Sequence, residues 1–241
     1  MTKRRIDSLL VERGLVESQA KAQALIMAGE VMVDGKTLTK SGTLAAEGAA
    51  ITISEPPPFV SRGGIKLDYA LDQFQLDVSS EVVADVGAST GGFTDCLLKR
   101  GASRVYAIDV GYGQLDYRLR QDSRVVVIER VNARYPITLP EKVDLATIDV
   151  SFISVEKVIP PVAELLKDSG YLLVLIKPQF EARRREVGKG GVIKQPVVHA
   201  RVLGRFIAWM IEHSFRLGGL VASPIVGASG NKEFFMLLKL T

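Results

Sequence analysis

Four charged side chains stand at or near the ends of four apolar runs in the second part of the chain: Asp85, Asp109, Asp149 and Lys177. Short runs dense in Val, Ile and Leu predict parallel strands that are covered on both faces. The carboxyl ends of such strands meet at one edge of an open sheet, where ligands bind, so we expect all four charges at one rim. Carboxylates and an ammonium gathered there could bind a polar ligand and move a proton.

A glycine-rich turn follows the first of these runs. The segment DVGASTGGFT at 85–94 predicts a strand, a tight turn and a helix, and Gly87, Gly91 and Gly92 would let the backbone approach a ligand closely. The free amides at the start of the helix would face the same ligand. Asp109, which ends the next run, is placed to accept hydrogen bonds from two ribose hydroxyls. Together these features predict a cofactor that contains a nucleoside.

The spacing of the glycines separates two classes of cofactor. The dinucleotide fingerprint needs glycines at three positions that are Gly87, Ser89 and Gly92 here, so the glycine that admits a pyrophosphate is absent. S-adenosylmethionine has no phosphate, and its amino-acid end could hydrogen-bond to Ser89, Thr90 and the nearby backbone. We therefore expect S-adenosylmethionine as the cofactor, with a dinucleotide-dependent oxidoreductase as the alternative.

The elements that must position these residues have the pattern of an α/β domain. The runs VVADVGA, RVYAIDV, VDLATIDV and YLLVLIK alternate with segments of helical period. This alternation is typical of a Rossmann-like, mostly parallel, doubly wound sheet. The last two runs, GLVASPIV and EFFMLLKL, predict an antiparallel hairpin with a short loop at the edge of that sheet.

The first 54 residues have a different pattern. RIDSLLVERG and SQAKAQALIMAG predict two short helices, and Ser18 is expected to cap the second one. An Asp34-Gly35 hairpin signal and the run AAITI predict a small β element. The prolines of EPPPF favour an extended connector. We therefore expect three parts: a small α+β domain over 1–54, a linker over 55–60 and a catalytic domain over 61–241.

The composition excludes several classes of protein. The chain has 241 residues, of which 47% are apolar and 24% charged, so it is neither disordered nor fibrous. A lone cysteine, Cys96, cannot form an internal disulfide, which favours a reducing compartment and predicts a cytoplasmic protein. No apolar run approaches the roughly 18 residues of a membrane helix. This argues against a membrane-active cytolysin and against a membrane partner.

Five ordered motifs carry a resemblance that covers nearly the whole chain: SRGGIKLDYAL, DVGASTGGFTDCLL, IDVSFIS, LIKPQFE and GNKEFF. Together with RIDSLLVERGL and KAQALIMAGEVMVDGK, they resemble the TlyA family of haemolysin-like ribosomal RNA methyltransferases. The resemblance implies an RNA-binding module, of the type named after ribosomal protein S-four, joined to an FtsJ-like methyltransferase domain. It also implies 2′-O-methylation of a cytidine in ribosomal RNA, either free or in ribosomal subunits. The RNA of the large subunit is the expected substrate, and that of the small subunit is an additional candidate.

The resemblance further implies the residues of the site. The catalytic tetrad is Lys66, Asp149, Lys177 and Glu233. The cofactor positions are Asp85, Gly87, Ser89, Thr90, Gly91, Gly92, Phe93, Thr94, Asp109 and Asn132. By residue type alone, Lys66 and Glu233 would be expected at the solvated surface.

Lys177 has two open roles in this chemistry. A ribose hydroxyl is a poor nucleophile, so the enzyme must align the reacting atoms and remove a proton. Lys177 could take that proton if it is neutral, or it could stabilise the developing alkoxide as a cation. The sequence leaves both roles open.

Basic residues gather immediately after Lys177. The segment from Lys177 to Arg205 holds eight Lys or Arg against two Glu, a net charge of +6, which exceeds the +4 of the whole chain. A basic, glycine-rich loop at the rim of the site predicts contacts with RNA phosphates through Arg183, Arg184, Arg185 and Lys189.

The small domain has a net charge of only +1, so an RNA-binding surface there requires basic residues gathered on one face. We assign this face to Lys3, Arg4, Arg5 and Lys21. A binding protein that has lost catalysis is a further alternative, and the complete tetrad argues against it.

Overall fold

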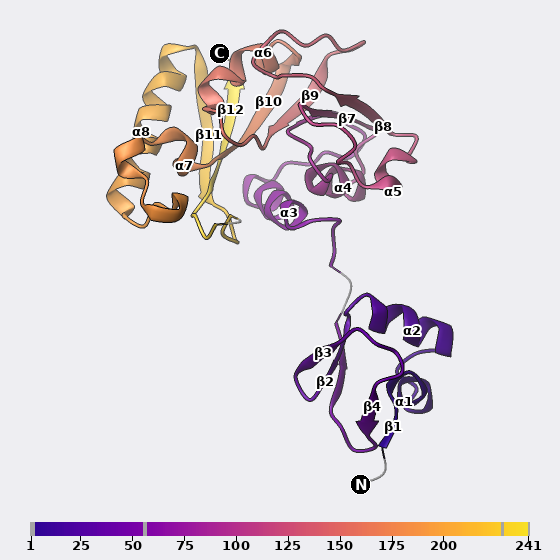
Figure 1. The fold of residues 1–241 in the computed structure, drawn as a ribbon. Coiled ribbons are helices and arrows are strands. Elements are labelled where there is room, and N and C mark those ends of the chain that lie inside the picture. Colours follow the sequence, from indigo (N-terminus) through magenta and orange to yellow (C-terminus); the bar gives the residue numbers. More distant parts are fainter. Residues whose placement is uncertain (1–2, 55–56, 228, 241) are drawn as a thin grey trace. The chain divides into compact units, whose positions relative to one another are not determined.

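A computed structural model describes residues 3–54, 57–227 and 229–240. The chain divides into two compact units, Met1–Pro57 and Pro58–Thr241 (Figure 1). Residues 55 and 56, which belong to the expected linker, lie outside the described residues. The first unit has one hydrophobic cluster of its own, and the second has two, one on each face of its sheet.

The N-terminal unit packs two helices against short strands. Helices α1 (Ile6–Glu12) and α2 (Gln19–Met27) bury Ile6, Leu10 and Ile26 in one cluster. The Ser18 hydroxyl accepts a hydrogen bond from the Lys21 amide, so the predicted cap is confirmed. The strands form two antiparallel sheets, one of β1 (Lys3–Arg5) and β4 (Leu44–Ala46), the other of β3 (Lys36–Leu38), β2 (Val31–Val33) and β5 (Ile51–Ile53).

The second unit is built on a seven-stranded sheet in the order β11-β12-β10-β9-β6-β7-β8. Five strands are parallel: β6 (Val82–Val86), β7 (Arg104–Asp109), β8 (Val125–Glu129), β9 (Val143–Ile148) and β10 (Leu166–Ile176). Strand β12 (Phe234–Leu240) is antiparallel to both β10 and β11 (Phe215–Ala222). The predicted mostly parallel α/β sheet is confirmed, whereas the half-buried edge strand β8 was not predicted.

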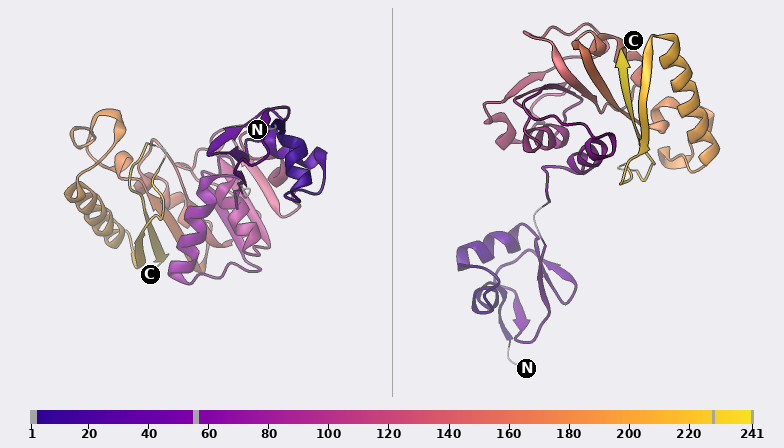
Figure 2. Two further views of the ribbon diagram at one scale, coloured as in Figure 1. Left: turned by 90° about the horizontal axis from the view of Figure 1, so that it is seen from below. Right: turned by 180° about the vertical axis from the view of Figure 1, so that it is seen from behind.

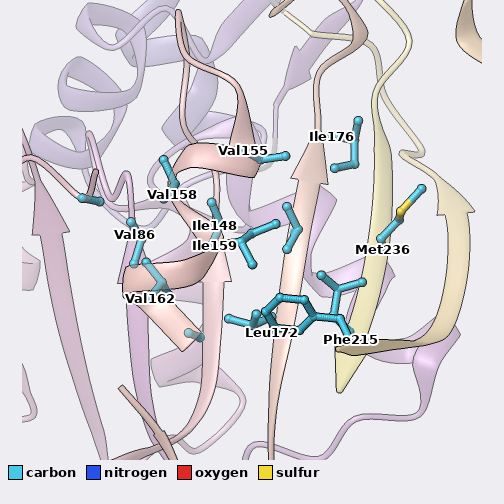
Figure 3. Close-up of a cluster of buried hydrophobic side chains, with 14 of the residues drawn as sticks. Val86, Ile148, Val155, Val158, Ile159, Val162, Leu172, Ile176, Phe215 and Met236 are labelled. Carbon is cyan, nitrogen blue, oxygen red and sulfur yellow. The ribbon is translucent and has the colours of Figure 1, made fainter. Parts of the chain in front are cut away.

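Helices cover both faces of this sheet, as Figures 1 and 2 show. Helices α3 (Arg62–Phe74) and α4 (Gly92–Lys99) pack on one face. The 3-10 turn η1 (Val155–Lys157), α6 (Ile159–Ala163) and α8 (Pro196–Glu212) pack on the other face. Figure 3 shows part of this cluster, including Val155 of η1 and Ile159 and Val162 of α6. In β10, Leu173 and Leu175 face α3 and α4, and Leu172, Val174 and Ile176 face α6 and α8. This explains the unbroken apolar run.

The C-terminal strands differ from the prediction in two ways. Strand β11 runs over Phe215–Ala222 instead of starting at Gly219, and it stops before Pro224, which has no amide to donate to a partner strand. The loop to β12 then spans residues 223–233, so the prediction of a short loop is wrong. Of these two strands, β11 lies at the edge of the sheet and β12 is enclosed between β10 and β11.

The direction of the chain reverses between β6 and β9. From β6 the strands proceed outward to β7 and β8, and the chain then returns to place β9 and β10 on the other side of β6. In open α/β sheets this switch point opens a crevice at the carboxyl ends of the two strands. The ends of β6 and β9 are therefore the expected place for a ligand.

Substitutions at two glycines, Gly64 and Gly204, would test the packing of the second unit. A Cβ added at Gly64 in α3 would overlap the ring of buried Phe59, whereas one added at Gly204 on the exposed side of α8 would meet no atom within 4 Å. We expect Gly64→Ala to lower the free energy of unfolding by about 1–3 kcal/mol through overpacking. Gly204→Ala should raise it by about 0.5–1 kcal/mol, since alanine favours a helix.

Urea unfolding followed by the fluorescence of the single tryptophan, Trp209, would measure both changes. Equal effects of the two substitutions would contradict the packing of Phe59 against α3.

Candidate active site

Two adjoining cavities open at the carboxyl ends of the parallel strands. The first, which we call the tetrad cavity, has a volume of about 750 Å³, and Lys66, Asp149, Lys177 and Glu233 are among its lining residues. The second, the Asp109 cavity, has a volume of about 540 Å³ and lies over the ends of β6, β7 and β9. Both cavities share Gly87, Ser89, Asp149, Ser151 and Phe152 as wall residues. They form one continuous site at the predicted rim.

The four tetrad residues form two ion pairs inside the tetrad cavity. Lys66 Nζ lies 2.6 Å from Glu233 Oε2, and Lys177 Nζ lies 2.6 Å from Asp149 Oδ1. Lys177 also donates a hydrogen bond to the Ser151 hydroxyl at 2.8 Å. The structure thus brings together residues that belong to α3, to the ends of β9 and β10, and to the start of β12.

The pair of Lys66 and Glu233 is the more deeply buried of the two. Their side chains are only 9% and 3% exposed, so the surface position expected from residue type alone is wrong for both. Burial of a lone charge would be costly, but each member of this pair supplies the opposite charge and a hydrogen-bond partner to the other. Sequence periodicity could not predict this contact, because the partners are 167 residues apart.

Asp109 orients the glycine-rich turn. Its Oδ2 accepts a hydrogen bond from the Ser89 amide at 2.8 Å, and its Oδ1 accepts one from the Gly111 amide at 2.6 Å. Each carboxylate oxygen has a second lone pair that a ligand hydroxyl can use. Asn132 lines the same cavity, and Thr90, Gly92 and Phe93 line the tetrad cavity.

Gly87 is a position of the turn at which a side chain would meet the backbone of another segment. Its φ of +89° favours glycine, and an added Cβ would overlap the Asp149 carbonyl oxygen. The close approach of these two backbone segments joins the end of β6 to the end of β9.

Asp85 does not lie at the rim, and here the sequence prediction is wrong. Position 85 is inside β6, and its fully buried carboxylate accepts hydrogen bonds from Thr94 Oγ1 at 2.6 Å and Thr147 Oγ1 at 3.1 Å. Burial raises the pKa of Asp85 to about 7. Thr94 is likewise buried, and Gly91 packs against Leu115 and Leu119, so none of the three lines either cavity.

Several wall residues were not predicted from the sequence. Phe152 has a φ of +63°, is 91% exposed and packs on Phe180, with ring centroids 5.0 Å apart. A bulky residue held in this backbone region often marks a functional position. The positions of Phe152, Gln179 and Asn231 within the motifs IDVSF, KPQFE and GNKEF are the signal that could have found them.

Asn231 fixes the loop that carries the basic residues. Its side chain accepts a hydrogen bond from the Ile193 amide and donates one to the Gly191 carbonyl, both at 2.9 Å. Arg183, Arg184, Arg185 and Lys189 of this loop are exposed, and Gly190 and Gly191 line the tetrad cavity. The predicted basic loop therefore stands at the mouth of the site.

The basic residues of the N-terminal unit are less available. Arg4 forms an ion pair with Glu12 at 2.6 Å, and Arg5 forms one with Asp7 at 2.7 Å. Lys3 and Lys21 are exposed. These pairs neutralise part of the face that the sequence assigns to RNA.

The buried carboxyl of Asp85 gives a testable dependence of stability on pH. Its pKa of about 7 in the folded chain lies above the unfolded value of 3.8, so the folded state holds a proton that the unfolded state releases. This contribution to stability is full below about pH 4 and is lost as the pH rises to about 7. We expect Asp85→Asn to remove it, because an amide does not titrate.

Urea unfolding at several pH values would compare the wild type with Asp85→Asn and with Asp168→Asn, a matched change on the surface. Parallel stability curves for the wild type and Asp85→Asn would contradict the prediction.

Comparisons with known proteins agree with this architecture. Residues 59–240 match the FtsJ-like methyltransferase family, and residues 4–51 match the S4 domain. The chain is 43% identical to the 16S/23S rRNA (cytidine-2′-O)-methyltransferase TlyA of Mycobacterium tuberculosis, over 98% of this chain and 89% of that one. It is 31% identical to the 23S rRNA (cytidine-2′-O)-methyltransferase TlyA of Campylobacter jejuni, over 93% and 95%.

Other relatives carry a different name. Hemolysin A of Brachyspira hyodysenteriae is 41% identical over 95% of this chain and 97% of that one. A solved structure of a Streptococcus thermophilus protein named as a hemolysin covers 100% of this chain and 90% of that one, with a TM-score of 0.76 and 41% identity. Within the described residues, no helix has the length and apolar character needed to cross a membrane. The chain belongs to the TlyA family, in which an S4 domain precedes an FtsJ-like methyltransferase domain.

Proposed function

We propose that this protein transfers a methyl group from S-adenosylmethionine to the ribose 2′-hydroxyl of a cytidine in ribosomal RNA. The observation that carries the proposal is the convergence of two lysines and two carboxylates in one cavity beside a glycine-rich turn. The relatives from M. tuberculosis and C. jejuni, similar over nearly their whole length, are named for this reaction.

The Asp109 cavity suits the nucleoside of the cofactor. The Asp109 carboxylate, already oriented by two backbone amides, would accept hydrogen bonds from the ribose hydroxyls, and Asn132 would contact the same moiety. Ser89 and Thr90 in the adjoining wall would hold the amino-acid end. When bound, S-adenosylmethionine supplies a methyl group attached to a positively charged sulfur.

Lys177 is placed to act on the ribose hydroxyl. Its Nζ is held between Asp149 Oδ1 and the Ser151 hydroxyl at the point where the two cavities meet. Lys177 forms an ion pair with Asp149, so of the two roles that the sequence leaves open we assign it the stabilising one. Its charge would offset the negative charge that develops on the oxygen as the proton leaves.

The other members of the tetrad support this arrangement. Asp149 orients Nζ of Lys177 and offers a carboxylate beside the departing proton. Lys66 and Glu233 also line the cavity, and their hydrogen bond joins α3 to the start of β12.

RNA would meet the site through surfaces of two kinds. The exposed arginines of the basic loop can bind phosphates, and the exposed ring of Phe152 at the mouth of both cavities offers a stacking surface for an unstacked base. The S4 domain would add a second RNA contact.

Substitution of Lys177 tests the proposed chemistry. We expect Lys177→Ala to lower the rate of methyl transfer to ribosomal RNA by roughly 10²- to 10⁴-fold, since the stabilising charge is lost. Binding of S-adenosylmethionine should survive, because Asp109 and the glycine-rich turn are untouched.

Labelled S-adenosylmethionine, incubated with ribosomal subunits or naked RNA, measures transfer, and calorimetry measures cofactor binding. Lys157→Ala, which truncates an exposed lysine elsewhere, is the control and should keep the wild-type rate. Equal transfer by Lys177→Ala and the wild type would refute the proposed role.

Substitution of the three arginines tests the RNA surface. We expect the change of Arg183, Arg184 and Arg185 together to alanine to weaken RNA binding and to reduce the slope of log affinity against log salt by up to about 2, at roughly 0.7 per single-strand phosphate contact.

Binding titrations from low to moderate salt would measure the slope. Arg216→Ala, at the opposite rim of the sheet, is the control. An unchanged slope in the triple variant would remove the basic loop from the RNA interface.

A further inference from the structure

We propose that Gln179 recognises the base of the target nucleotide and selects cytosine, an inference that rests on the proposed function. Gln179 lies in α7 (Pro178–Glu181), two residues after Lys177, and lines the tetrad cavity. Its Oε1 is buried and has no hydrogen-bond partner among the described residues. A buried acceptor without a partner destabilises a protein, so one that lines a ligand cavity is well suited to a donor from the ligand.

The side-chain amide of Asn231, which also lines the cavity, already forms two hydrogen bonds. Asn231 uses its oxygen for the Ile193 amide and its nitrogen for the Gly191 carbonyl. Glu233 is paired with Lys66, and Asp149 with Lys177. Among these described wall residues, Gln179 is therefore the one that retains a buried amide oxygen without a partner.

The surroundings of Gln179 suit a flat base. Phe180 follows it directly and packs on Phe152, and both rings line the tetrad cavity with Gln179. The base of a nucleotide is attached to the sugar carbon next to the one that bears the 2′-hydroxyl. A hydroxyl held at Lys177 therefore leaves its base close to the same part of the wall.

In the orientation that the structure gives it, the Oε1 acceptor of Gln179 distinguishes the two pyrimidines of RNA. Cytosine has a 4-amino group that donates a hydrogen bond, whereas uracil has a carbonyl oxygen at the same position. Gln179 Oε1 would accept from the amino group, as carbonyl and carboxylate oxygens do in base recognition. Uracil would leave the buried oxygen unpaired and place a second acceptor against it.

The experiment uses three RNA fragments that differ only at the mapped target nucleotide: cytidine, 2-pyrimidinone riboside, which lacks the 4-amino group, and uridine. The wild type should methylate the cytidine fragment about tenfold or more faster than either analogue, the effect of one hydrogen bond to a buried group. Gln179→Ala should bring the three rates to within about threefold of one another. Gln179→Glu, whose side chain still accepts, should keep the preference for cytidine.

Gln121→Ala is the matched control, because it makes the same change on an exposed side chain outside both cavities. To separate recognition from catalysis, the affinities of Lys177→Ala and of Lys177→Ala/Gln179→Ala for the cytidine and 2-pyrimidinone fragments are also compared. This measurement remains informative even if Gln179→Ala is inactive.

The outcomes separate the two proposals. If the wild type methylates none of the fragments or subunits, the proposed function fails. If it methylates them and Gln179→Ala keeps the preference in rate or affinity, or if the wild type has no preference between cytidine and 2-pyrimidinone, the assignment of Gln179 is overturned.

Discussion

The buried ion pair between Lys66 and Glu233 is the interaction on which the site depends. Lys66 lies in α3, the first helix of the second unit, and Glu233 directly precedes β12, its last strand. The pair therefore joins the two ends of the domain sequence. Removal of either partner would leave an uncompensated buried charge, which typically costs about 3–5 kcal/mol. Desolvation of the two charges offsets much of the attraction between them, so a buried ion pair adds little net stability. Its position in the wall of a cavity explains its presence better.

The sheet topology explains why the remaining groups meet. The reversal between β6 and β9 brings the ends of these strands together, and Gly87 allows the two backbones to touch at that point. Asp149 and Lys177 then follow adjacent parallel strands, β9 and β10, in neighbouring positions. Asp109 ends β7 on the other side of β6 and faces the second cavity. The reversal of strand order thus places the residues proposed to bind the cofactor next to those proposed to act on the ribose hydroxyl.

Local sequence patterns predicted the parallel sheet, the rim and the glycine-rich turn, because these follow from hydrophobic runs and from the backbone freedom of glycine. They failed where the outcome depends on contacts between distant segments. The Asp85 carboxylate is buried because Thr94 and Thr147 donate hydrogen bonds to it, and the local pattern around position 85 does not indicate either partner. Lys66 and Glu233 were recovered only through motifs, since a lysine in an amphipathic helix carries no sign of a distant partner. The unpaired oxygen of Gln179 could not be predicted, because it is defined by which other wall residues are already bonded.

The two hydrogen bonds of Asn231 have an entropic consequence. They tie the backbone of Gly191 and Ile193 to the segment that leads into Glu233, so the glycine-rich end of the basic loop is restrained before any nucleic acid arrives. Glycine loses more conformational freedom on ordering than other residues do. A loop that is ordered in advance gives up less of that freedom on association, so more of the phosphate attraction is left to appear as affinity.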